Sequence, residues 1–330
     1  MTKQTINLGN DILCIDVDYL RPQLACSYLI HHQGKAAFID CGTNHSVDRL
    51  LAALQQFNLK PEDVAFIIPS HVHLDHAGGA GRLMQLCPNA QLVVHPLGAP
   101  HLINPKRLVE SARSVYGKAL FAKLYGEIVP IDKTRVIHIT PDSTINLNGR
   151  WLRIIDSPGH ARHHICVYDA LSRAWFVGDT FGLSYPDITL SAKQAWAKQY
   201  LMPTTTPVQF DPSAWQQTLQ KLLSTAPEKV FLAHFADFKE VEKGVLKLQA
   251  DIQAYVHIAE ACSSAQNRVA SIEESLITYT LNDLKQCGCE QDKETILGLL
   301  KHDLHLNAQG LDIWLARQET TQQLHAQAQR

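Results

Sequence analysis

The chain has 330 residues, of which 45% are hydrophobic and 19% are charged, and its formal net charge is −2. This length allows one large domain, or one domain with a smaller appendage, and the near-neutral charge argues against a general binder of polyanions. The eight cysteines form no C-x-x-C pair, and no apolar run approaches the roughly twenty residues that span a bilayer, so we expect a cytoplasmic protein with reduced thiols.

The amino-terminal part of the chain is predicted to form strands and then a helix. Apolar, β-branched runs predict strands over 12–17, 24–31 and 35–40. Ser46 is then expected to cap an amphipathic helix, whose apolar stripe contains Val47, Leu50, Leu51, Leu54 and Phe57.

The next strand, over 64–68, leads into a cluster of potential metal ligands. Because open α/β sheets place ligand sites at the carboxyl ends of strands, the cluster stands where a site is expected. Alternate residues of an extended loop project to one side, so His71 and His73 are placed to hold one cation. Asp75 and His76 lie further round the turn and are placed to face a second. Imidazole and carboxylate are ligands that borderline metals prefer.

A short helix to about residue 86 and a strand over 91–94 are expected next. Asn104 and Pro105 then predict the start of a helix that continues to about residue 124. This helix interrupts the strand pattern, and whether it only packs on the body or overhangs the site stays open.

Strands are predicted again after this helix. The runs 143–147 and 151–156 are joined by Asn148-Gly149, a strong signal for a hairpin, and further strands are expected over 165–168 and 174–177.

The remaining sequence begins with a long loop and becomes helical. Residues 182–207 are rich in Pro, Thr and Ser, and loops of this length are usually functional or mobile. Asp211 is expected to cap a helix, a strand is expected over 229–233, and the chain is helical from about residue 239. Ser271 and Glu274 predict a capping box there.

These elements predict two domains. We expect a metal-binding α/β domain over 1–236 and a helical carboxyl-terminal part over 237–330 that packs on it. Whether segments 104–124 and 182–207 form a lid over the site stays open.

Three later strands also end at a potential metal ligand. His160 follows the strand over 151–156, Asp179 follows 174–177, and His234 follows 229–233. A single histidine after a strand is weak evidence, but here each apolar strand delivers one potential ligand at the same end.

In combination, these motifs resemble the metallo-β-lactamase superfamily, in the arrangement seen in glyoxalase II-like hydrolases. The resemblance covers about residues 11–236 and rests on His71-x-His73-x-Asp75-His76, Pro158-Gly159-His160, Gly178-Asp179-Thr180 and His234. It implies an α/β fold, the αββα metallo-β-lactamase sandwich, here with a helical C-terminal extension, and a dinuclear metal centre.

The resemblance also implies a role for each ligand. His71, His73 and His160 would hold the first metal, and Asp75, His76 and His234 would hold the second. Asp179 would bridge the two metals together with a water or hydroxide. His164 fits a position near the site that does not bind metal. Tyr185 is a candidate hydrogen-bond donor to an oxyanion or a leaving group.

The sequence departs from several branches of the superfamily. The zinc β-lactamases have no bridging aspartate where Asp179 stands, so penicillin hydrolysis is not expected. Flavodiiron oxidoreductases carry glutamate where His73 stands, and no flavin-binding domain follows. The accessory motifs of the tRNA-processing and nuclease branches are not recognisable.

We therefore predict a metallo-hydrolase that cleaves an ester, thioester or lactone. Two metals about 3.5–4 Å apart lower the pKa of a shared water, so that a bridging hydroxide attacks the carbonyl carbon. Asp75 and Asp179 are the catalytic carboxylates, with Tyr185 assisting. Zinc is the expected metal, with iron and manganese as alternatives.

Three other functions stay open: a phosphodiester or phosphotriester hydrolase, an iron-dependent sulfur dioxygenase, and a non-catalytic ligand-binding regulator. The expected partner is a small-molecule substrate, with neither nucleic acid nor membrane. A homodimer is not excluded.

Overall fold

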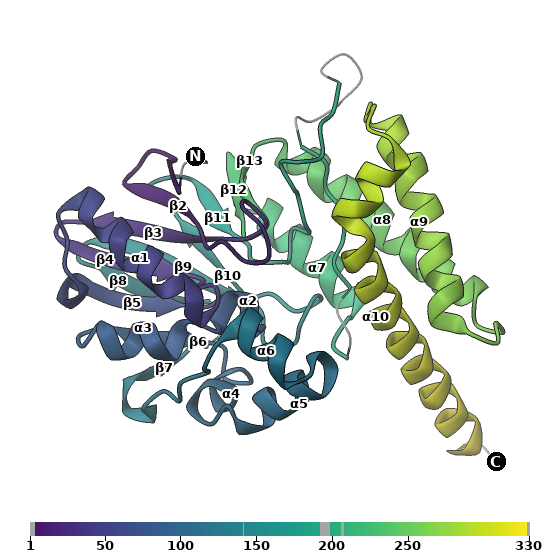
Figure 1. Cartoon of the computed structure of the whole chain (residues 1–330), viewed down its shortest axis with the longest axis horizontal. Coiled ribbons are helices and arrows are strands. Elements are labelled where there is room, and N and C mark those ends of the chain that lie inside the picture. The colour runs from purple at the N-terminus through teal and green to yellow at the C-terminus, as the bar shows by residue number, and fades with distance from the viewer. Residues whose placement is uncertain (1–3, 141, 192–198, 206–207, 329–330) are drawn as a thin grey trace. The chain divides into compact units, whose positions relative to one another are not determined.

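The computed structural model describes residues 4–140, 142–191, 199–205 and 208–328, which form two compact units (Figure 1). The first unit comprises the chain up to Ser157, His163–Thr180 and Thr225–Lys239, and the second comprises Pro158–Arg162, Phe181–Ser224 and the chain from Glu240. The predicted domain boundary at residue 236 stays a prediction.

The first unit contains a seven-stranded sheet whose strands follow one another in chain order. The strands are β1 (Thr5–Asn7), β2 (Ile12–Asp16), β3 (Cys26–His32), β4 (Lys35–Ile39), β5 (Val64–Ile68), β6 (Gln91–Val94) and β7 (Val136–His138). Strands β1 to β4 are antiparallel and β4 to β7 are parallel, so β4 and β5 end at the same edge. Five of these strands confirm predictions, whereas β1 and β7 were missed because three residues are too short for a periodic pattern.

The second sheet of this unit has six strands in the order β13-β12-β11-β10-β9-β8. They are β8 (Ser143–Leu147), β9 (Arg150–Asp156), β10 (Ile165–Asp169), β11 (Ala174–Phe176), β12 (Lys229–Leu232) and β13 (Ala236–Phe238). The predicted hairpin β8–β9 turns at Asn148 and Gly149, both with positive φ, as two-residue hairpin turns require. Strands β11 and β12 are parallel and therefore also end at one edge.

Two apolar layers hold the first unit together. One contains Tyr28 and Val93 of the first sheet together with Leu152 and Phe176 of the second, so the sheets face each other. The other joins the opposite face of the first sheet to helices α1 (Val47–Leu54) and α3 (Ala80–Leu86) (Figure 1). Because both faces of the first sheet are covered, β2 is buried along its whole length, which explains its continuous apolar run.

The start of α1 differs from the prediction. A 3-10 turn over Asn44–Ser46 precedes the helix, so Thr43 rather than Ser46 begins the helical segment. The Ser46 hydroxyl donates to the Val17 carbonyl 2.9 Å away and makes no cap bond for α1.

The helix predicted over 104–124 is two helices, α5 (Lys106–Tyr116) and α6 (Lys118–Tyr125), preceded by the unpredicted α4 (Ala99–Ile103). Gly117, with φ of +74°, separates α5 from α6 because a helix cannot continue through this conformation. Phe121 and Tyr125 pack with Leu74 of α2 (Leu74–Ala77). Helix α6 therefore lies beside the segment 70–76, which carries the first potential metal ligands and is called the metal-ligand loop below.

The second unit is mainly helical, and its last three helices confirm the helical region predicted from about residue 239. It contains α7 (Pro212–Leu223), α8 (Val241–Ala261), α9 (Arg268–Gln286) and α10 (Lys293–Ala328). The Asp211 carboxylate caps α7 by accepting from the amide of Ala214 at 3.0 Å, which confirms the predicted cap.

The capping box predicted at Ser271 and Glu274 is wrong. Helix α9 already begins at Arg268, where the Asn267 side chain accepts from the amide of Ala270. Ser271 therefore lies inside the helix, where its backbone amide bonds to the Asn267 carbonyl.

The long loop predicted over 182–207 is described only in part, since 192–198 and 206–207 lie outside the described residues. Its described residues form no helix or strand, and isolated bridges pair Leu183 with Met202 and Leu190 with Cys289. Among the described residues, no helix combines the length and apolar character needed to cross a membrane.

A buried ion pair between Arg150 and Asp169 yields a prediction about stability. Burial alone would raise the pKa of Asp169, but hydrogen bonds and charge from Arg150 lower it, with Nε to Oδ1 at 2.9 Å. Asp169→Asn should therefore lower the free energy of unfolding by about 3–5 kcal/mol, because the Arg150 charge stays buried without its partner. Urea unfolding at pH 7 measures this change.

The exposed pair of Arg153 and Asp142 provides the control, since Asp142→Asn should change stability by about 0–1 kcal/mol. Because the folded pKa of Asp169 is lowered, its contribution is present above the unfolded pKa and is lost as the pH falls through the folded pKa. Equal effects of the two substitutions would contradict the prediction.

Candidate metal centre

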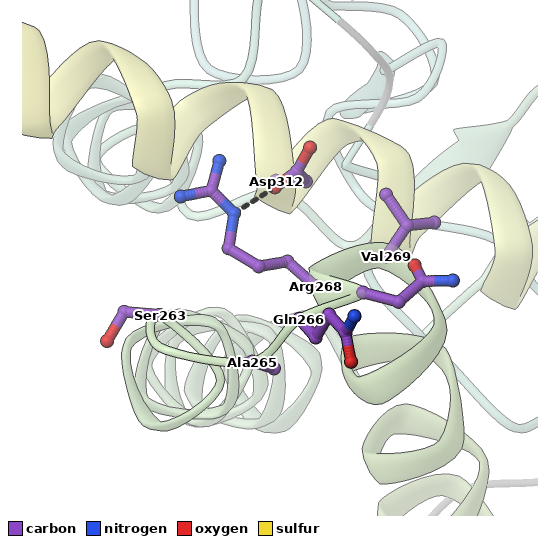
Figure 2. A pocket seen from close by; sticks show the side chains of 7 residues that line it. Ser263, Ala265, Gln266, Arg268, Val269 and Asp312 are labelled. Atoms are coloured by element: carbon purple, nitrogen blue, oxygen red, sulfur yellow. Dashed lines mark hydrogen bonds and ion pairs between the residues drawn. The ribbon is translucent and has the colours of Figure 1, made fainter.

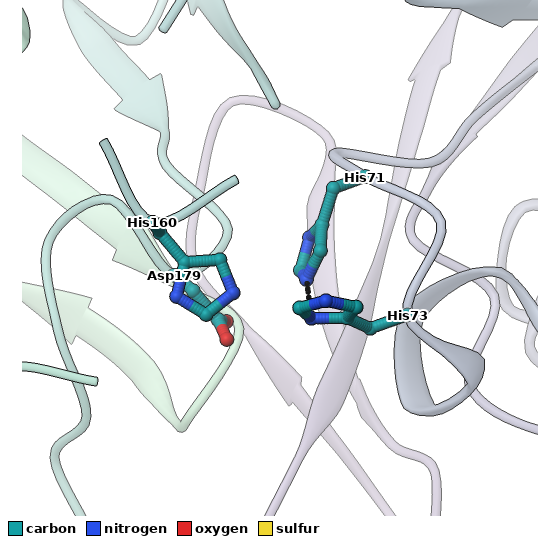
Figure 3. A group of neighbouring side chains, drawn as sticks. All are labelled: His71, His73, His160 and Asp179. Carbon is teal, nitrogen blue, oxygen red and sulfur yellow. Dashed lines mark hydrogen bonds between the residues drawn. The ribbon is translucent and has the colours of Figure 1, made fainter. Parts of the chain in front are cut away.

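The metal-ligand loop begins shortly after β5 and is held in place by hydrogen bonds of Ser70. The amide of Ser70 donates to Asp40 Oδ1 at 2.7 Å, and Ser70 Oγ lies 3.0 Å from Nδ1 of His71. His71 is completely buried. Its Nε2 lies 2.7 Å from Nδ1 of His73, so the two imidazoles point their ring nitrogens at one place (Figure 3).

His71 and His73 belong to a group of four potential ligands that also contains His160 and Asp179 (Figure 3). One ligand atom of each residue lies within 4.8 Å of those of the other three. Two atoms that share an ion with bonds of about 2.0–2.2 Å lie up to about 4.4 Å apart. The ligand atoms of this group are therefore close to the spacing that a shared ion requires.

A second group consists of Asp75, His76 and His234, whose ligand atoms also lie within 4.8 Å of one another. Asp75 and His76 come from the single turn of α2, and His234 follows β12. The seven sequence-predicted ligands thus lie in two groups of neighbouring side chains, and the assignment of each to a metal stays a prediction.

Asp179 faces the second group as well as the first. Its Oδ1 lies 3.2 Å from Nε2 of His76 and 3.5 Å from Nε2 of His234. Asp75 Oδ2 approaches the same two nitrogens at 3.5 and 3.7 Å. Because β11 and β12 are parallel, Asp179 and His234 follow neighbouring strands at one edge. Asp179 therefore lies close to ligand atoms of both groups, and its bridging role stays a prediction.

Backbone carbonyls determine which nitrogen two of the histidines present to the centre. His234 Nδ1 lies 2.7 Å from the carbonyl of Leu24, and His160 Nδ1 lies 2.8 Å from the carbonyl of Thr204. Each contact requires a proton on Nδ1, which leaves the lone pair on Nε2 as the metal-binding atom.

Asp40 is a residue of the centre that our sequence analysis missed. It is buried directly after β4, and its Oδ2 lies 3.1 Å from both His76 Nδ1 and Ser70 Oγ. It therefore orients one candidate ligand and anchors the loop that carries the others. The signal was a lone aspartate after the apolar strand 35–39, recognisable only once β4 is known to lie parallel to β5.

His164 lies behind Asp179 and uses both ring nitrogens within the protein. Its Nδ1 is 2.8 Å from Ser157 Oγ, and its Nε2 accepts from the Asp179 amide at 3.2 Å. Gly178 permits this approach, because a Cβ there would lie 2.5 Å from His164 Nε2, and its φ is +46°. His164 thus holds the Asp179 backbone and does not face an ion.

Charge in the centre favours a cation. Burial by itself would lower the pKa of His76, but the carboxylates of Asp179, Asp75 and Asp40 raise the pKa well above its ordinary value. Among the described residues, His76 Nε2 is buried with no hydrogen-bond partner, although two carboxylates face it. A nitrogen in this setting fits a divalent metal, and the nitrogen and oxygen ligands without thiolate suit zinc, iron or manganese.

Two further residues concern the site: Tyr185, which was predicted, and His163, which was not. Tyr185 lies in the second unit and is almost fully buried, and its assistance to catalysis stays a prediction. His163 was not predicted, because it stands beside the motif histidines without a spacing of its own. Its buried ring lies 6.2 Å from that of His71 and 6.0 Å from that of His73.

A separate pocket of about 770 Å³ lies in the second unit (Figure 2). It is lined by Ser263, Ala265, Gln266, Asn267, Arg268, Val269 and Asp312. Arg268 Nε donates to Asp312 Oδ1 at 2.6 Å, so the guanidinium is already paired. The pocket contains none of the candidate metal ligands.

Comparison with known proteins identifies related chains. A family model described as the Metallo-beta-lactamase superfamily matches residues 21–234. The metallo-beta-lactamase fold-containing protein ST1585 of Sulfurisphaera tokodaii is 27% identical over 217 residues, which are 64% of this chain and 73% of that protein. Glyoxylase B2 of Dictyostelium discoideum is 27% identical over 144 residues, which are 43% of this chain and 42% of that protein.

Solved structures share the fold. A metallo-beta-lactamase family protein of Thermus thermophilus has a TM-score of 0.65 at 17% identity, and the likeness covers 95% of each chain. The predicted sandwich with a helical C-terminal extension is therefore confirmed, and the glyoxalase II-like branch receives weak support from one relative.

The position of Asp40 leads to a prediction about metal affinity. Asp40→Ala removes the acceptor for His76 Nδ1 and for the Ser70 amide. We expect zinc to bind about 10–100-fold more weakly, the usual effect of losing such a supporting contact. Titration with a competing chelator measures the affinity. Asp18→Asn changes an exposed carboxylate after β2 and should leave the zinc affinity unchanged. Equal zinc affinities for the two variants would contradict the supporting role of Asp40.

Proposed function

Since the chain belongs to the metallo-beta-lactamase superfamily, we propose that it is a metal-dependent hydrolase with a dinuclear centre. The first ion would be held by His71, His73 and His160, the second by Asp75, His76 and His234, with Asp179 shared. The observation that carries this proposal is the carboxylate of Asp179, whose Oδ1 faces His76 and His234 while the residue also belongs to the first group.

Two cations in these positions would lower the pKa of a water shared between them and polarise the carbonyl oxygen of a substrate. The chain's own residues supply the geometry. Asp179 would offset the charge of both ions, and Asp75 would offset that of the second. The Leu24 carbonyl keeps a proton on Nδ1 of His234, so its Nε2 stays available to the centre. We retain Tyr185 as a proposed donor to the oxyanion or the leaving group.

We propose an ester, thioester or lactone as the substrate class. The resemblance to glyoxalase II-like hydrolases supports this choice, and so does the name of the Dictyostelium relative. The net charge of −2 gives no support to a polyanionic substrate. Zinc is the proposed metal, because imidazole nitrogen and carboxylate oxygen, which both groups supply, are ligands that zinc binds.

The decisive experiment combines metal analysis with a substrate screen on the full chain. Protein loaded with zinc, iron or manganese is tested on ester, thioester, lactone and phosphodiester substrates, with and without oxygen. Zinc-dependent cleavage of a carbonyl substrate without oxygen is the expected result. Cleavage restricted to phosphodiesters, or turnover that requires iron and oxygen, would contradict the proposal.

Asp179 and Asp75 allow the dinuclear assignment to be tested. Asp179→Asn keeps the shape of the side chain but removes the charge shared by two cations. We expect it to weaken at least one metal site and to abolish most turnover. Asp75→Asn should mainly affect the second ion and leave one metal bound. Native mass spectrometry counts the metals in each variant, against about two for the wild type.

If Asp179→Asn retained two metals and a near-normal rate, Asp179 would serve only the turn after Gly178. The hydrolase assignment would then rest on the motif from His71 to His76 alone.

A further inference from the structure

His160 is held within the second unit by a short, tightly packed loop. Thr218 Oγ1 donates to the Pro158 carbonyl at 2.7 Å, and the Asp211 amide donates to the Gly159 carbonyl at 2.8 Å. Gly159 has φ of +142°, and a Cβ there would lie 2.4 Å from Cβ of Trp215. The backbone of the loop is therefore fixed against α7.

The ring of His160 packs edge-on against Trp215, with ring centroids 6.2 Å apart, and its Nδ1 lies 2.8 Å from the Thr204 carbonyl. As long as this carbonyl stays in place, the proton stays on Nδ1 and the lone pair of Nε2 stays available. The orientation of His160 thus depends on what holds Thr204.

Asn307 of α10 binds the residues on both sides of Thr204. Its Oδ1 accepts from the Thr205 amide at 2.6 Å, and its Nδ2 donates to the Pro203 carbonyl at 3.0 Å. The Thr205 hydroxyl also donates to the backbone carbonyl of Asn307 at 3.0 Å. Asn307 is almost completely buried, with 1% of its surface exposed.

Helix α9 holds the same segment at its other end. The Tyr200 hydroxyl donates to Asp283 at 2.7 Å, and Lys247 of α8 binds the same carboxylate at 2.6 Å. The segment 199–205 is therefore tied to the carboxyl-terminal helices at two places, and the tie next to Thr204 is Asn307.

We infer that Asn307 is a positioning residue for the metal ligand His160, acting through the Thr204 carbonyl. The inference rests on the proposed metal centre. It gives the carboxyl-terminal helices a role in that centre, although Asn307 lies beyond the residues 21–234 that match the family model. Removal of the amide releases Pro203 and Thr205, so the Thr204 carbonyl no longer holds the His160 ring in one orientation.

The test measures zinc affinity of the full-length chain by competition with a chelator, at a temperature where the variants are folded. Asn307→Ala should weaken zinc binding about tenfold, at the lower end of the usual range for such supporting contacts. Gln309→Ala is the matched control. Gln309 lies on the same helix, and its amide nitrogen contacts His305 at 3.0 Å. Because this contact does not involve the segment 203–205, zinc affinity should not change.

A double-mutant cycle distinguishes positioning from a general loss of structure. If Asn307 acts through His160, Asn307→Ala should have no further effect on zinc affinity in a His160→Ala background. An equal loss in both backgrounds would overturn the inference, and so would an unchanged affinity in Asn307→Ala.

Should Asn307→Ala fail to fold, Thr205→Val provides the test. It removes the hydroxyl that donates to the Asn307 carbonyl and keeps the side-chain shape. Zinc affinity should then fall in the same His160-dependent way but by a smaller factor, and no change would overturn the inference. A wild-type chain that binds zinc but cleaves no substrate would contradict the proposed function and leave this inference standing.

Discussion

The constraint on which this structure depends is the burial of carboxylates beside imidazoles. Asp40 and Asp179 are almost fully buried, and His76 lies between them with contacts of 3.1 and 3.2 Å. A buried carboxylate is costly unless a positive charge or a set of hydrogen bonds compensates for it. Ser70 donates hydrogen bonds to Asp40, and the nitrogens of His76 and His234 approach Asp179 Oδ1 at 3.2 and 3.5 Å. A cation would supply the remaining compensation. We therefore expect metal binding to stabilise the loops that carry these buried carboxylates.

Parallel strand pairs make this concentration of charge geometrically possible. Strands β4 and β5 run in the same direction, so Asp40 and the loop that begins at Ser70 leave the first sheet at one edge. In the second sheet, β11 and β12 are parallel, so Asp179 and His234 also follow neighbouring strands. The apolar layer between the two sheets packs them face to face. Within the second unit, the ring of His160 is linked to α10 by Thr204 and Asn307.

Sequence patterns identified the candidate metal ligands but not the residues that position them. Histidines and aspartates with short, regular spacings after apolar strands stand out because the amino-acid types themselves are the ligands. Asp40, His163 and Asn307 do not stand out, since each acts through a neighbour that is distant in the sequence. The same reason explains the errors in the helices. Ser46 and Ser271 have the side chains of caps, but the Ser46 hydroxyl donates to Val17, and Ser271 lies inside α9, whose cap is Asn267.

The sequence by itself determined most strands, the helical carboxyl-terminal region and the set of candidate ligands, and the resemblance of its motifs to a family implied the fold class. The strands, helices and candidate ligands depend on local periodicity and on residue type, both of which can be read along the chain. Only the tertiary structure decided that Asp179 Oδ1 approaches His76 and His234, which nitrogen of His160 and His234 faces away from a backbone carbonyl, and that Asp40 contacts His76. Those features depend on contacts between residues tens to more than two hundred positions apart, and such contacts exist only once the sheets have paired and the helices have packed.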